Sequence, residues 1–445
     1  MTVDYEWFRE ELEPYLSRDR WLVAYSGGLD SSVLLRLLVE IRNSGDSAPS
    51  LEAVHVNHGL SAEAHQWQQH CIDTCAQYQV PLTVIGVDVV DDGLGLEAAA
   101  RQARYQQFEQ ILSVRALLLM AHHLDDQVET FFLRLLRGSG VDGLVAMPSH
   151  RDLGQGQIFR PLLAVARSEL EHMAKAFGLS WVEDDSNTDM GFDRNFLRSQ
   201  ILPLVEQRWP GYRKTVTRAV DHMIGSRQII SKVTAAELEV CSEGANGQKL
   251  MLGPLLSHEE VLSASILRAW LGRQQLPVPR SEQLKEFLQQ IRSKASDTSP
   301  ILHGRGYEIR SFQHELYLLA PEVEFDSAQS VGVKSGQEVV IDGVGTVKIE
   351  VGSEWSAEFI SKLSIRFRQG GERCRPCGRE HTQSLKKLMQ EYQIEPWWRA
   401  RVPLIYLADR LLAVGDYWLC AGTEPDYQLP PLKVSWIRQA LNNHN

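Results

Sequence analysis

The stretch WLVAYSGGLDSS, residues 21–32, joins an apolar run to two glycines and a hydroxyl-rich turn. Its apolar run predicts a buried strand, and the apolar residues that follow at helical spacing predict a helix. Paired glycines allow positive φ angles and let backbone N–H groups approach an anion without obstruction by side chains. The amino end of a helix also attracts negative charge, because its first N–H groups lack intrahelical partners. The stretch therefore predicts a phosphate-binding turn at the carboxyl end of a strand.

This turn is richer in polar groups than a connection between a strand and a helix requires. Serine hydroxyls can donate to phosphate oxygens, and Asp30 is placed to bind Mg²⁺ beside them. The patterns GxxxxGK[ST] and GxGxxG are absent, so the turn is neither a Walker loop nor a dinucleotide-binding turn. A strand–helix turn with a serine cap is the alternative, which the complete SGGLDS pattern disfavours. The candidate phosphate ligands are Ser26, Gly27, Gly28, Leu29, Asp30 and Ser31.

Outward from this turn, residues 1–212 alternate short apolar runs with helical patterns. Further strands are expected at 51–57, 82–88 and 116–121, with helices between them. This alternation predicts an α/β domain with a doubly wound, mainly parallel sheet that is covered by helices on both faces. Ligands of such sheets bind at the carboxyl ends of the strands. We therefore expect the chemistry where these strands end.

Three further segments follow this nucleotide-binding domain. Residues 213–320 are mostly helical in pattern and end in a small hairpin, and residues 321–354 read as a connector rich in Val, Gly and acidic groups. Residues 355–440 form a basic unit that turns strand-like in its second half, which predicts a small α+β domain. The basic composition of the C-terminal domain favours RNA binding.

The overall charge first argues against a polyanionic partner. The 445 residues include 46 Lys and Arg against 57 Asp and Glu, for a net charge of −11. A uniformly basic nucleic-acid-binding surface is therefore excluded. Positive charge is instead gathered locally: ten Lys and Arg face four Glu across 361–402, and six face one Glu across 194–218. Basic residues interleaved with aromatic ones, such as Phe367 and Trp397, are typical of contacts with RNA phosphates and bases.

The chain carries no sign of a membrane or secretory protein. No apolar run approaches the ~18–20 residues of a membrane span. The first residues lack the basic start and apolar middle of a signal peptide. Six cysteines in so long a chain do not suggest a disulfide scaffold. We therefore expect a cytoplasmic protein with no membrane partner.

A second cluster of polar residues follows the strand expected at 116–121. His122, Asp126 and Glu129 are spaced at i, i+4 and i+7, so they share one face of a helix. An imidazole and two carboxylates at a strand's carboxyl end could hold an ammonium ion, a metal ion or a ribose, and a solvated acidic helix start is the alternative. On another expected helix, Arg101 and Arg104 are one turn apart and could place guanidinium charge near phosphate. Taken alone, this pair favours the alternative of two solvated arginines on a surface helix.

These motifs together resemble known enzymes. Residues 26–31 resemble the PP-loop of N-type ATP pyrophosphatases, and residues 55–60 (HVNHGL) resemble an element found beside that loop. With HHLDDQVET at 122–130, the segment 183–203 and RFRQGGER at 366–373, the ordered series is similar to the tRNA(Ile)-lysidine synthase family over nearly the whole chain. The resemblance implies a ligase that uses ATP and Mg²⁺ to adenylate the wobble cytidine, position 34, of a CAU-anticodon tRNA(Ile). Free L-lysine then displaces AMP, giving lysidine and changing codon specificity from AUG to AUA.

The resemblance also implies that the middle domain, residues 213–320, binds substrate, and it implies roles for individual residues. Asp30 would serve Mg²⁺–ATP, with His58 as a further nucleotide ligand, and Arg104 and Arg198 would contact the activated cytidine or the pyrophosphate. The face made by His122, Asp126 and Glu129 would bind ATP and lysine. The group that deprotonates the lysine amine is not identified. The expected RNA-binding residues are Arg194, Arg366, Arg368, Arg373, Lys386, Lys387 and Arg399.

Several alternatives stay open at this stage. A 2-thiocytidine synthetase of the same superfamily would need a reactive cysteine near the nucleotide, where only Cys71 and Cys75 occur, at core-like helical spacing. A non-catalytic RNA-binding adaptor is disfavoured by the intact SGGLDS and HHLDDQVET motifs. Cys374 and Cys377 depart from the family's usual pattern, and we interpret them as incidental because no second CxxC follows. A homodimer is one assembly that we consider.

Overall fold

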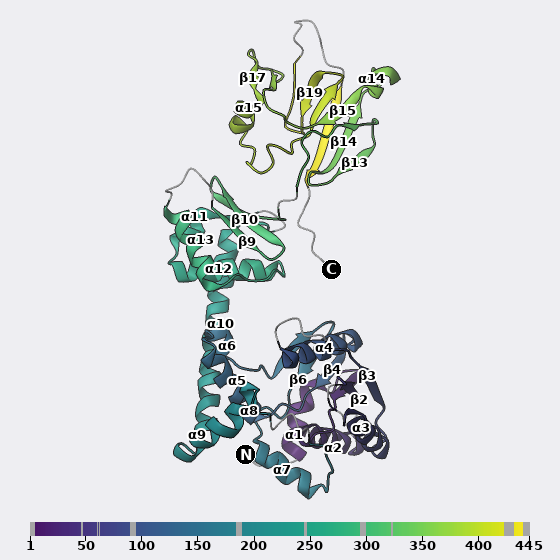
Figure 1. Cartoon of the computed structure of the whole chain (residues 1–445), viewed down its shortest axis with the longest axis vertical. Helices are drawn as coiled ribbons and strands as arrows, with labels where there is room; N and C mark the ends of the chain where they lie inside the picture. Colours follow the sequence, from purple (N-terminus) through teal and green to yellow (C-terminus); the bar gives the residue numbers. More distant parts are fainter. Residues whose placement is uncertain are drawn as a thin grey trace. The chain divides into compact units, whose positions relative to one another are not determined.

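The computed structural model describes residues 5–45, 48–59, 61, 63–89, 95–183, 189–243, 247–293, 300–321, 324–421 and 431–438. The chain divides into two compact units, 1–230 and 231–445, and the long helix α10 (Tyr212–Cys241) passes from one into the other (Figure 1). None of the described helices is both long and apolar enough to cross a lipid bilayer.

The first unit is built on a six-stranded sheet in the order β3-β2-β1-β4-β6-β5. All neighbours pair in parallel except β5 and β6, which form an antiparallel hairpin at one edge. The predicted α/β fold with a mainly parallel sheet is therefore confirmed. Its strands are β1 (Arg20–Ala24), β2 (Ser50–Asn57), β3 (Leu82–Gly86), β4 (Ala116–Leu119), β5 (His150–Leu153) and β6 (Gly156–Phe159).

Two hydrophobic cores cover the two faces of this sheet. Side chains alternate along a strand, so Trp21 and Val23 of β1 enter one core and Leu22 enters the other. The first core receives α1, α2, α3 and α7, and the second receives Phe108 of α4. The helices of the unit are α1 (Tyr5–Leu12), α2 (Leu29–Asn43), α3 (Ala64–Gln77), α4 (Leu96–Ile111), α5 (Leu124–Leu136), α6 (Val141–Leu144), α7 (Arg167–Ala176), α8 (Asp193–Phe196) and α9 (Leu202–Arg208).

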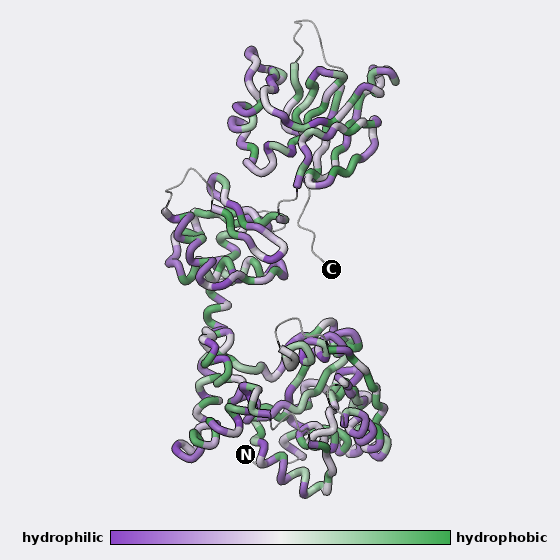
Figure 2. The backbone as a smooth tube through the Cα atoms, viewed as in Figure 1, coloured by the Kyte–Doolittle hydropathy of each residue, from purple (hydrophilic) through white to green (hydrophobic). Residues whose placement is uncertain are grey.

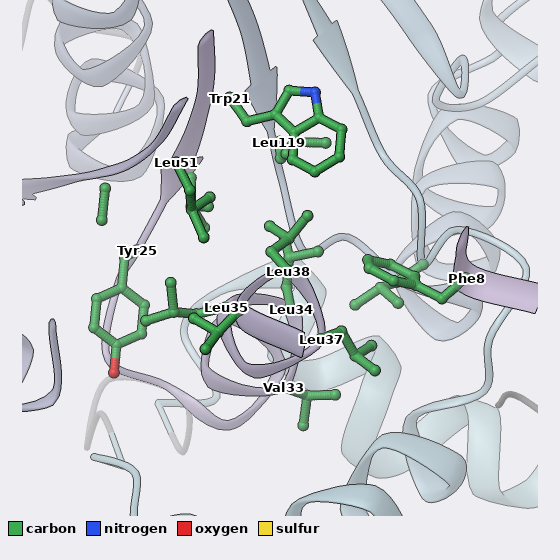
Figure 3. Packing of buried hydrophobic residues seen from close by; sticks show 14 of the residues in the cluster. Phe8, Trp21, Tyr25, Val33, Leu34, Leu35, Leu37, Leu38, Leu51 and Leu119 are labelled. Carbon is green, nitrogen blue, oxygen red and sulfur yellow. The ribbon is translucent and has the colours of Figure 1, made fainter. Parts of the chain in front are cut away.

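Helix α2 is buried around most of its circumference. Figure 3 shows Leu34 and Leu38 of this helix directed toward Trp21 and Leu119 of the sheet, and all four side chains are within 1% of complete burial. Each fully buried leucine contributes about 1.5–3 kcal/mol to folding. The glycine turn at the start of α2 is therefore fixed to the most rigid part of the unit.

The second unit begins with a part that combines helices with an antiparallel sheet in the order β7-β8-β11-β10-β9. The hairpin expected near 307–319 is formed by β10 and β11. A core that includes the fully buried Trp270 and Tyr307 joins the helices to the sheet. The elements are α10, α11 (Leu252–Ser257), α12 (Glu260–Arg273), α13 (Ser281–Ser293), β7 (Ser242–Glu243), β8 (Lys249–Met251), β9 (Ile301–Gly304), β10 (Tyr307–Phe312) and β11 (Glu315–Leu319).

The segment 321–354, expected as a connector, carries three strands of the C-terminal sheets. Strand β14 pairs along its whole length with β21, which lies at the end of the described chain, and it buries Val347 and Ile349. Pairing between such distant segments leaves no local signal in the sequence. In Figure 2 hydrophobic residues concentrate on the central strands of this part. Its elements are β12 (Val331–Gly332), β13 (Glu338–Ile341), β14 (Gly345–Val351), α14 (Ala357–Ser361), β15 (Leu363–Arg366), β16 (Arg373–Cys374), β17 (Gln383–Ser384), α15 (Leu385–Glu391), β18 (Leu404–Leu407), β19 (Arg410–Val414), β20 (Trp418–Leu419) and β21 (Leu432–Arg438).

Candidate active site

The glycine turn lies at the carboxyl end of β1, a central strand of the parallel sheet, and leads into α2. Gly27 has φ +83°, and its carbonyl accepts a hydrogen bond from the N–H of Val182 at 3.0 Å. A Cβ added at Gly27 would lie 2.9 Å from Cys71 Sγ and 3.2 Å from Val182 Cγ2. Both the backbone conformation and the close approach therefore require glycine here.

Hydroxyl groups hold the rest of this turn in place. Ser26 Oγ lies 3.0 Å from Ser31 Oγ and accepts a hydrogen bond from the N–H of Gly28 at 3.3 Å. Ser31 Oγ in turn donates to the carbonyl of Gly28 at 3.0 Å. Leu29 is buried and anchors the first turn of the helix. The turn is thus preorganised before any ligand arrives, as a phosphate site at a helix start requires.

Asp30 stands at the first turn of α2 with one carboxylate oxygen in an unusual environment. Its Oδ1 is buried and has no hydrogen-bond partner among the described residues. Burial raises the pKa of Asp30, and the nearby carboxylate of Asp126 adds to that rise, whereas His123, Arg167 and Arg198 oppose it. A buried carboxylate oxygen without a hydrogen-bond partner among the described residues fits a Mg²⁺ ion, which prefers oxygen ligands.

His123 links this aspartate to the second polar cluster. It follows β4, immediately before α5, and its side chain is 1% exposed. Its Nε2 lies 3.6 Å from Asp30 Oδ2 and 3.5 Å from Asp126 Oδ2, and its Nδ1 lies 3.9 Å from Asp125 Oδ2. The imidazole is therefore enclosed by three carboxylates. Sequence reasoning chose His122 from the HH pair and missed His123, because spacing alone does not tell which of two adjacent histidines faces Asp30.

Glu129 is held by two arginines from another segment. Its side chain is 1% exposed, and it accepts hydrogen bonds from Arg194 Nε at 2.9 Å, Arg198 Nε at 2.6 Å and Arg198 Nη2 at 3.0 Å. Arg198 Nη2 also lies 3.5 Å from Asp126 Oδ1. Burial would raise the pKa of Asp126, but the charges of His123 and Arg194 lower it. The structure thus brings the predicted residues of α5 together with Arg194, expected to bind RNA, and Arg198.

His122 lies before α5, which begins at Leu124, so the expectation that it shares a helix face with Asp126 and Glu129 is wrong, and it has a partner of its own. Arg160, which directly follows β6, donates from Nε to His122 Nδ1 at 3.2 Å and from Nη1 to the carbonyl of Pro148 at 2.8 Å. Arg160 is 3% exposed, an unusual burial for an arginine. Sequence reasoning missed Arg160, since the sequence does not show which strand end lies beside His122.

His58 and Arg104 complete the set around the strand ends. Burial lowers the pKa of His58, and the charges of Arg104 and His55 lower it further. Arg104 also acts electrostatically on His122, so α4 contributes positive charge to the same region. Residues 184–188 and Leu60, which belong to the motifs predicted here, lie outside the described residues.

The other residues expected to bind RNA lie in the second unit. Lys386 and Lys387 are exposed on α15, and Arg366 lies over the ring of Tyr406 at 4.7 Å. Arg368 lies 3.9 Å from Glu372, whereas Arg373 and Arg399 donate to the backbone carbonyls of Thr382 and Ile394. Their contact with RNA stays a prediction.

Two further features of the C-terminal part are the burial of Phe367 and the environment of Cys374 and Cys377. Phe367 is 2% exposed and packs in the core of the C-terminal part, so its expected contact with RNA bases is wrong. Cys374 is buried and accepts a hydrogen bond from Trp418 Nε1 at 3.4 Å, while Cys377 is exposed. Within the described ranges, no group of three or more His, Cys, Asp or Glu side chains is arranged to hold a metal ion.

Known families match all three parts of the chain. Residues 4–205 match a PP-loop domain, residues 250–317 match the TilS substrate binding domain, and residues 363–436 match the TilS substrate C-terminal domain. The matched segments follow one another in the order in which the structure forms its three successive cores.

Curated relatives match nearly end to end. The tRNA(Ile)-lysidine synthase of Coxiella burnetii is 37% identical over 414 residues, which cover 92% of this chain and 91% of that protein. The protein of the same name from Serratia proteamaculans is 40% identical over 426 residues, covering 94% and 95%. That of Escherichia coli O157:H7 is 38% identical over 400 residues, covering 88% and 91%.

Proposed function

The chain belongs to the tRNA(Ile)-lysidine synthase family of ATP-using PP-loop enzymes, and we propose that it ligates free L-lysine to the wobble cytidine of CAU-anticodon tRNA(Ile). One observation carries the proposal beyond the family. The glycine turn and the cluster of Asp126, Glu129, Arg194 and Arg198 are joined through Asp30 and His123 at the ends of neighbouring strands. This adjacency supports a phosphate site beside a site for a cationic amine, as adenylation followed by amine attack requires. We place the reaction in the cytoplasm.

Two steps account for the chemistry. In the first, the C2 oxygen of the cytidine attacks the α-phosphate of ATP and pyrophosphate leaves. The N–H groups at the start of α2 and the guanidinium groups of Arg104 and Arg198 stabilise the negative charge that develops on the phosphates. In the second step, the lysine ε-amine attacks C2, its proton is lost and AMP leaves with the former C2 oxygen. Activation as an adenylate converts a poor leaving group into a good one.

Asp30 is the residue that would hold Mg²⁺ in this scheme. Its Oδ1 is buried without a partner among the described residues, so a cation beside it would remove the penalty of an unsatisfied buried oxygen. When bound, Mg²⁺ supplies positive charge to the polyphosphate. Asp30 itself orients that charge, because it is fixed on the buried helix α2.

The lysine is proposed to bind beside Asp126. An ammonium group is attracted to this carboxylate, whose other neighbours include His123 and Arg198. Glu129 is fully occupied by Arg194 and Arg198, so we assign it to holding the two guanidinium groups toward the substrate. The amine must lose a proton before it attacks, and a pocket that is partly dry lowers the pKa of an amine.

The tRNA is proposed to contact the basic residues of the second unit. Lys386 and Lys387 are exposed and Arg366 is partly exposed. Such contacts with phosphates weaken steeply with salt, and they hold the substrate without reading its sequence. The affinity for tRNA is therefore expected to fall with rising salt more strongly than the affinity for ATP.

Pyrophosphate release tests the proposal. The full chain is incubated with ATP, Mg²⁺, tRNA(Ile) transcript and lysine, and each component is omitted in turn. We expect pyrophosphate release to require tRNA, and lysine transfer to the tRNA to require both tRNA and ATP. Asp30→Ala is expected to lose both activities, whereas Lys285→Ala, which changes an exposed residue of α13, is expected to keep them. Release that does not depend on tRNA would contradict the proposal.

A sulfur-transferring enzyme of the same superfamily is the rival reading, and the cysteines near the turn do not suit it. Cys71 and Cys75 are both buried in the first core. Burial raises the pKa of each thiol to about 12. Since the thiolate is the reactive form of cysteine, these side chains are structural.

A further inference from the structure

We propose that Arg160 is a positioning residue that fixes His122 as the neutral tautomer protonated at Nε2, so that His122 serves the reaction as a hydrogen-bond donor and not as a base. The role in the reaction rests on the proposed function, whereas the tautomer can be observed without it. The spacing of the HHLDDQVET motif predicts neither the pairing of Arg160 with His122 nor the tautomer of His122.

The first step of the argument is the direction of one hydrogen bond. Arg160 Nε donates to His122 Nδ1 at 3.2 Å. A guanidinium group has only donors and stays protonated in proteins, so Nδ1 must present its lone pair. A neutral imidazole carries one proton, which therefore resides on Nε2. Nε2 is then the ring atom that can meet a substrate, and it can only donate.

The second step is the surrounding charge, which opposes a second proton on the ring. Burial, together with the charges of Arg160, Arg101 and Arg104, lowers the pKa of His122 to about 3. Asp126 is the one neighbour in that set that acts in the opposite direction. The imidazolium form is therefore not populated at neutral pH, and neither nitrogen is available as a proton acceptor there.

The third step is the rigidity of Arg160. Its backbone N–H donates to the carbonyl of Ser149 at 2.8 Å, and its Nη1 donates to Pro148 at 2.8 Å. Tyr105 of α4 interacts with the same guanidinium group and raises its pKa against the effect of burial. Arg160 directly follows β6 and is thus held by the segment just before β5 and by α4, which fixes the ring of His122 as well as its proton.

One consequence concerns the unassigned base of the second step. His122 cannot accept the proton of the lysine ammonium while its Nδ1 faces Arg160. It can instead donate from Nε2 to an oxygen of the nucleotide or of the adenylated cytidine, where negative charge develops. The proton of the amine must leave to another acceptor.

Nitrogen-15 NMR of the full chain, labelled at histidine, tests the tautomer directly. The chain has 14 histidines, and His122→Gln identifies the signal of His122. We expect the shift pattern of an Nε2–H tautomer that stays unchanged from about pH 5 to 8, where an ordinary histidine titrates. An Nδ1–H pattern, or titration within that range, would overturn the proposal whatever activity the variants retain.

Variants then test the positioning role. In Arg160→Met the donor that fixes the tautomer is lost. We expect the His122 signal to move toward a mixture of the two neutral tautomers, because burial still opposes a second proton on the ring, and we expect kcat to fall about tenfold or more, with a smaller change in KM. Arg151→Met is the matched control, because Arg151 lies over the Tyr105 ring at 4.8 Å and makes no hydrogen bond to His122 in the described structure. An Arg160→Met protein with an unchanged His122 signal would contradict the assignment.

Two substitutions of His122 distinguish a hydrogen-bond donor from a base at this position. Glutamine can donate a hydrogen bond but cannot act as a base, so His122→Gln should retain about tenfold more activity than His122→Ala. Equal loss in both variants would contradict the donor role. If the NMR pattern holds but no variant or wild-type protein transfers lysine, the proposed function fails and the tautomer assignment stands.

Discussion

Replacing Glu129 by glutamine is expected to destabilise the first unit and to disable the site together. Glu129 is 1% exposed and accepts three hydrogen bonds, at 2.6, 2.9 and 3.0 Å, from Arg194 and Arg198. Glutamine keeps the shape of the side chain. It removes the negative charge and turns one acceptor into an NH₂ donor that faces a guanidinium group.

The magnitude follows from these contacts. A hydrogen bond to a charged group is worth about 1.5–3 kcal/mol, and breaking a buried ion pair costs about 3–5 kcal/mol. The side chains of Arg194 and Arg198 are 26% and 32% exposed, so water screens part of the interaction. We therefore expect a loss near the lower end, about 3 kcal/mol, which corresponds to about a hundredfold in an opening equilibrium.

Hydrogen exchange followed by mass spectrometry measures this loss where it arises. Peptides from α5 and from 193–208 should exchange faster in Glu129→Gln, whereas peptides from α12 in the second unit should not change. Glu206→Gln is the matched control, because it removes the same charge from a 48% exposed carboxylate whose partner Arg213 also binds Asp125. An exposed pair is worth about 0.5 kcal/mol, so this control should be nearly silent. Equal effects in the two variants would refute the reasoning.

Three further changes have expected outcomes. Gly27→Ala should lower the free energy of unfolding by about 1–3 kcal/mol and abolish ATP binding, because φ is +83° and a Cβ would lie 2.9 Å from the buried sulfur of Cys71. Gly28→Ala is the control and should fold normally, because φ at Gly28 is −74°. Calorimetry of unfolding and of ATP binding compares the two variants. Asp30→Asn should raise the denaturation midpoint at pH 7 while abolishing ATP use. Burial raises the pKa of Asp30 above its ordinary 3.8, so its ionisation opposes folding as pH rises through the folded pKa, and the gain should vanish below pH 3.8. Asp125→Asn should do the reverse: burial would raise the pKa of Asp125, but hydrogen bonds from a backbone N–H and from Arg213 lower it, so its contribution is present above pH 3.8 and is lost as pH falls through the folded pKa. Urea midpoints between pH 3 and 8 that fail to move in opposite directions for these two aspartates would contradict the electrostatic account.

The sequence predicts those parts of the molecule whose signals are local. The strand, glycine turn and helix of residues 21–43 are read correctly because hydrophobic period, glycine conformation and helix start coincide in one short stretch. The spacing of Asp126 and Glu129 likewise predicts one face of a helix. The site could therefore be placed at the ends of the strands before the structure was known.

What the sequence could not supply is pairing between distant segments. Arg160 meets His122, and Arg198 meets Glu129, because the sheet order and the segment after α7 bring them together. The same limit explains why the sequence predicts a connector at 321–354: its strand β14 pairs with β21, far along the chain. The choice between His122 and His123 depends on the path of the extended backbone before α5, which spacing does not define.

Nucleoside analysis of the product tests the central claim most directly. A tRNA(Ile) transcript with a CAU anticodon is incubated with the full chain, ATP, Mg²⁺ and isotopically labelled lysine, then digested to nucleosides and analysed by mass spectrometry. We expect the wobble cytidine to gain the mass of one labelled lysine less one water, only when ATP is present, and not with Asp30→Ala. A cytidine that stays unmodified, or that gains sulfur in place of lysine, would contradict the account.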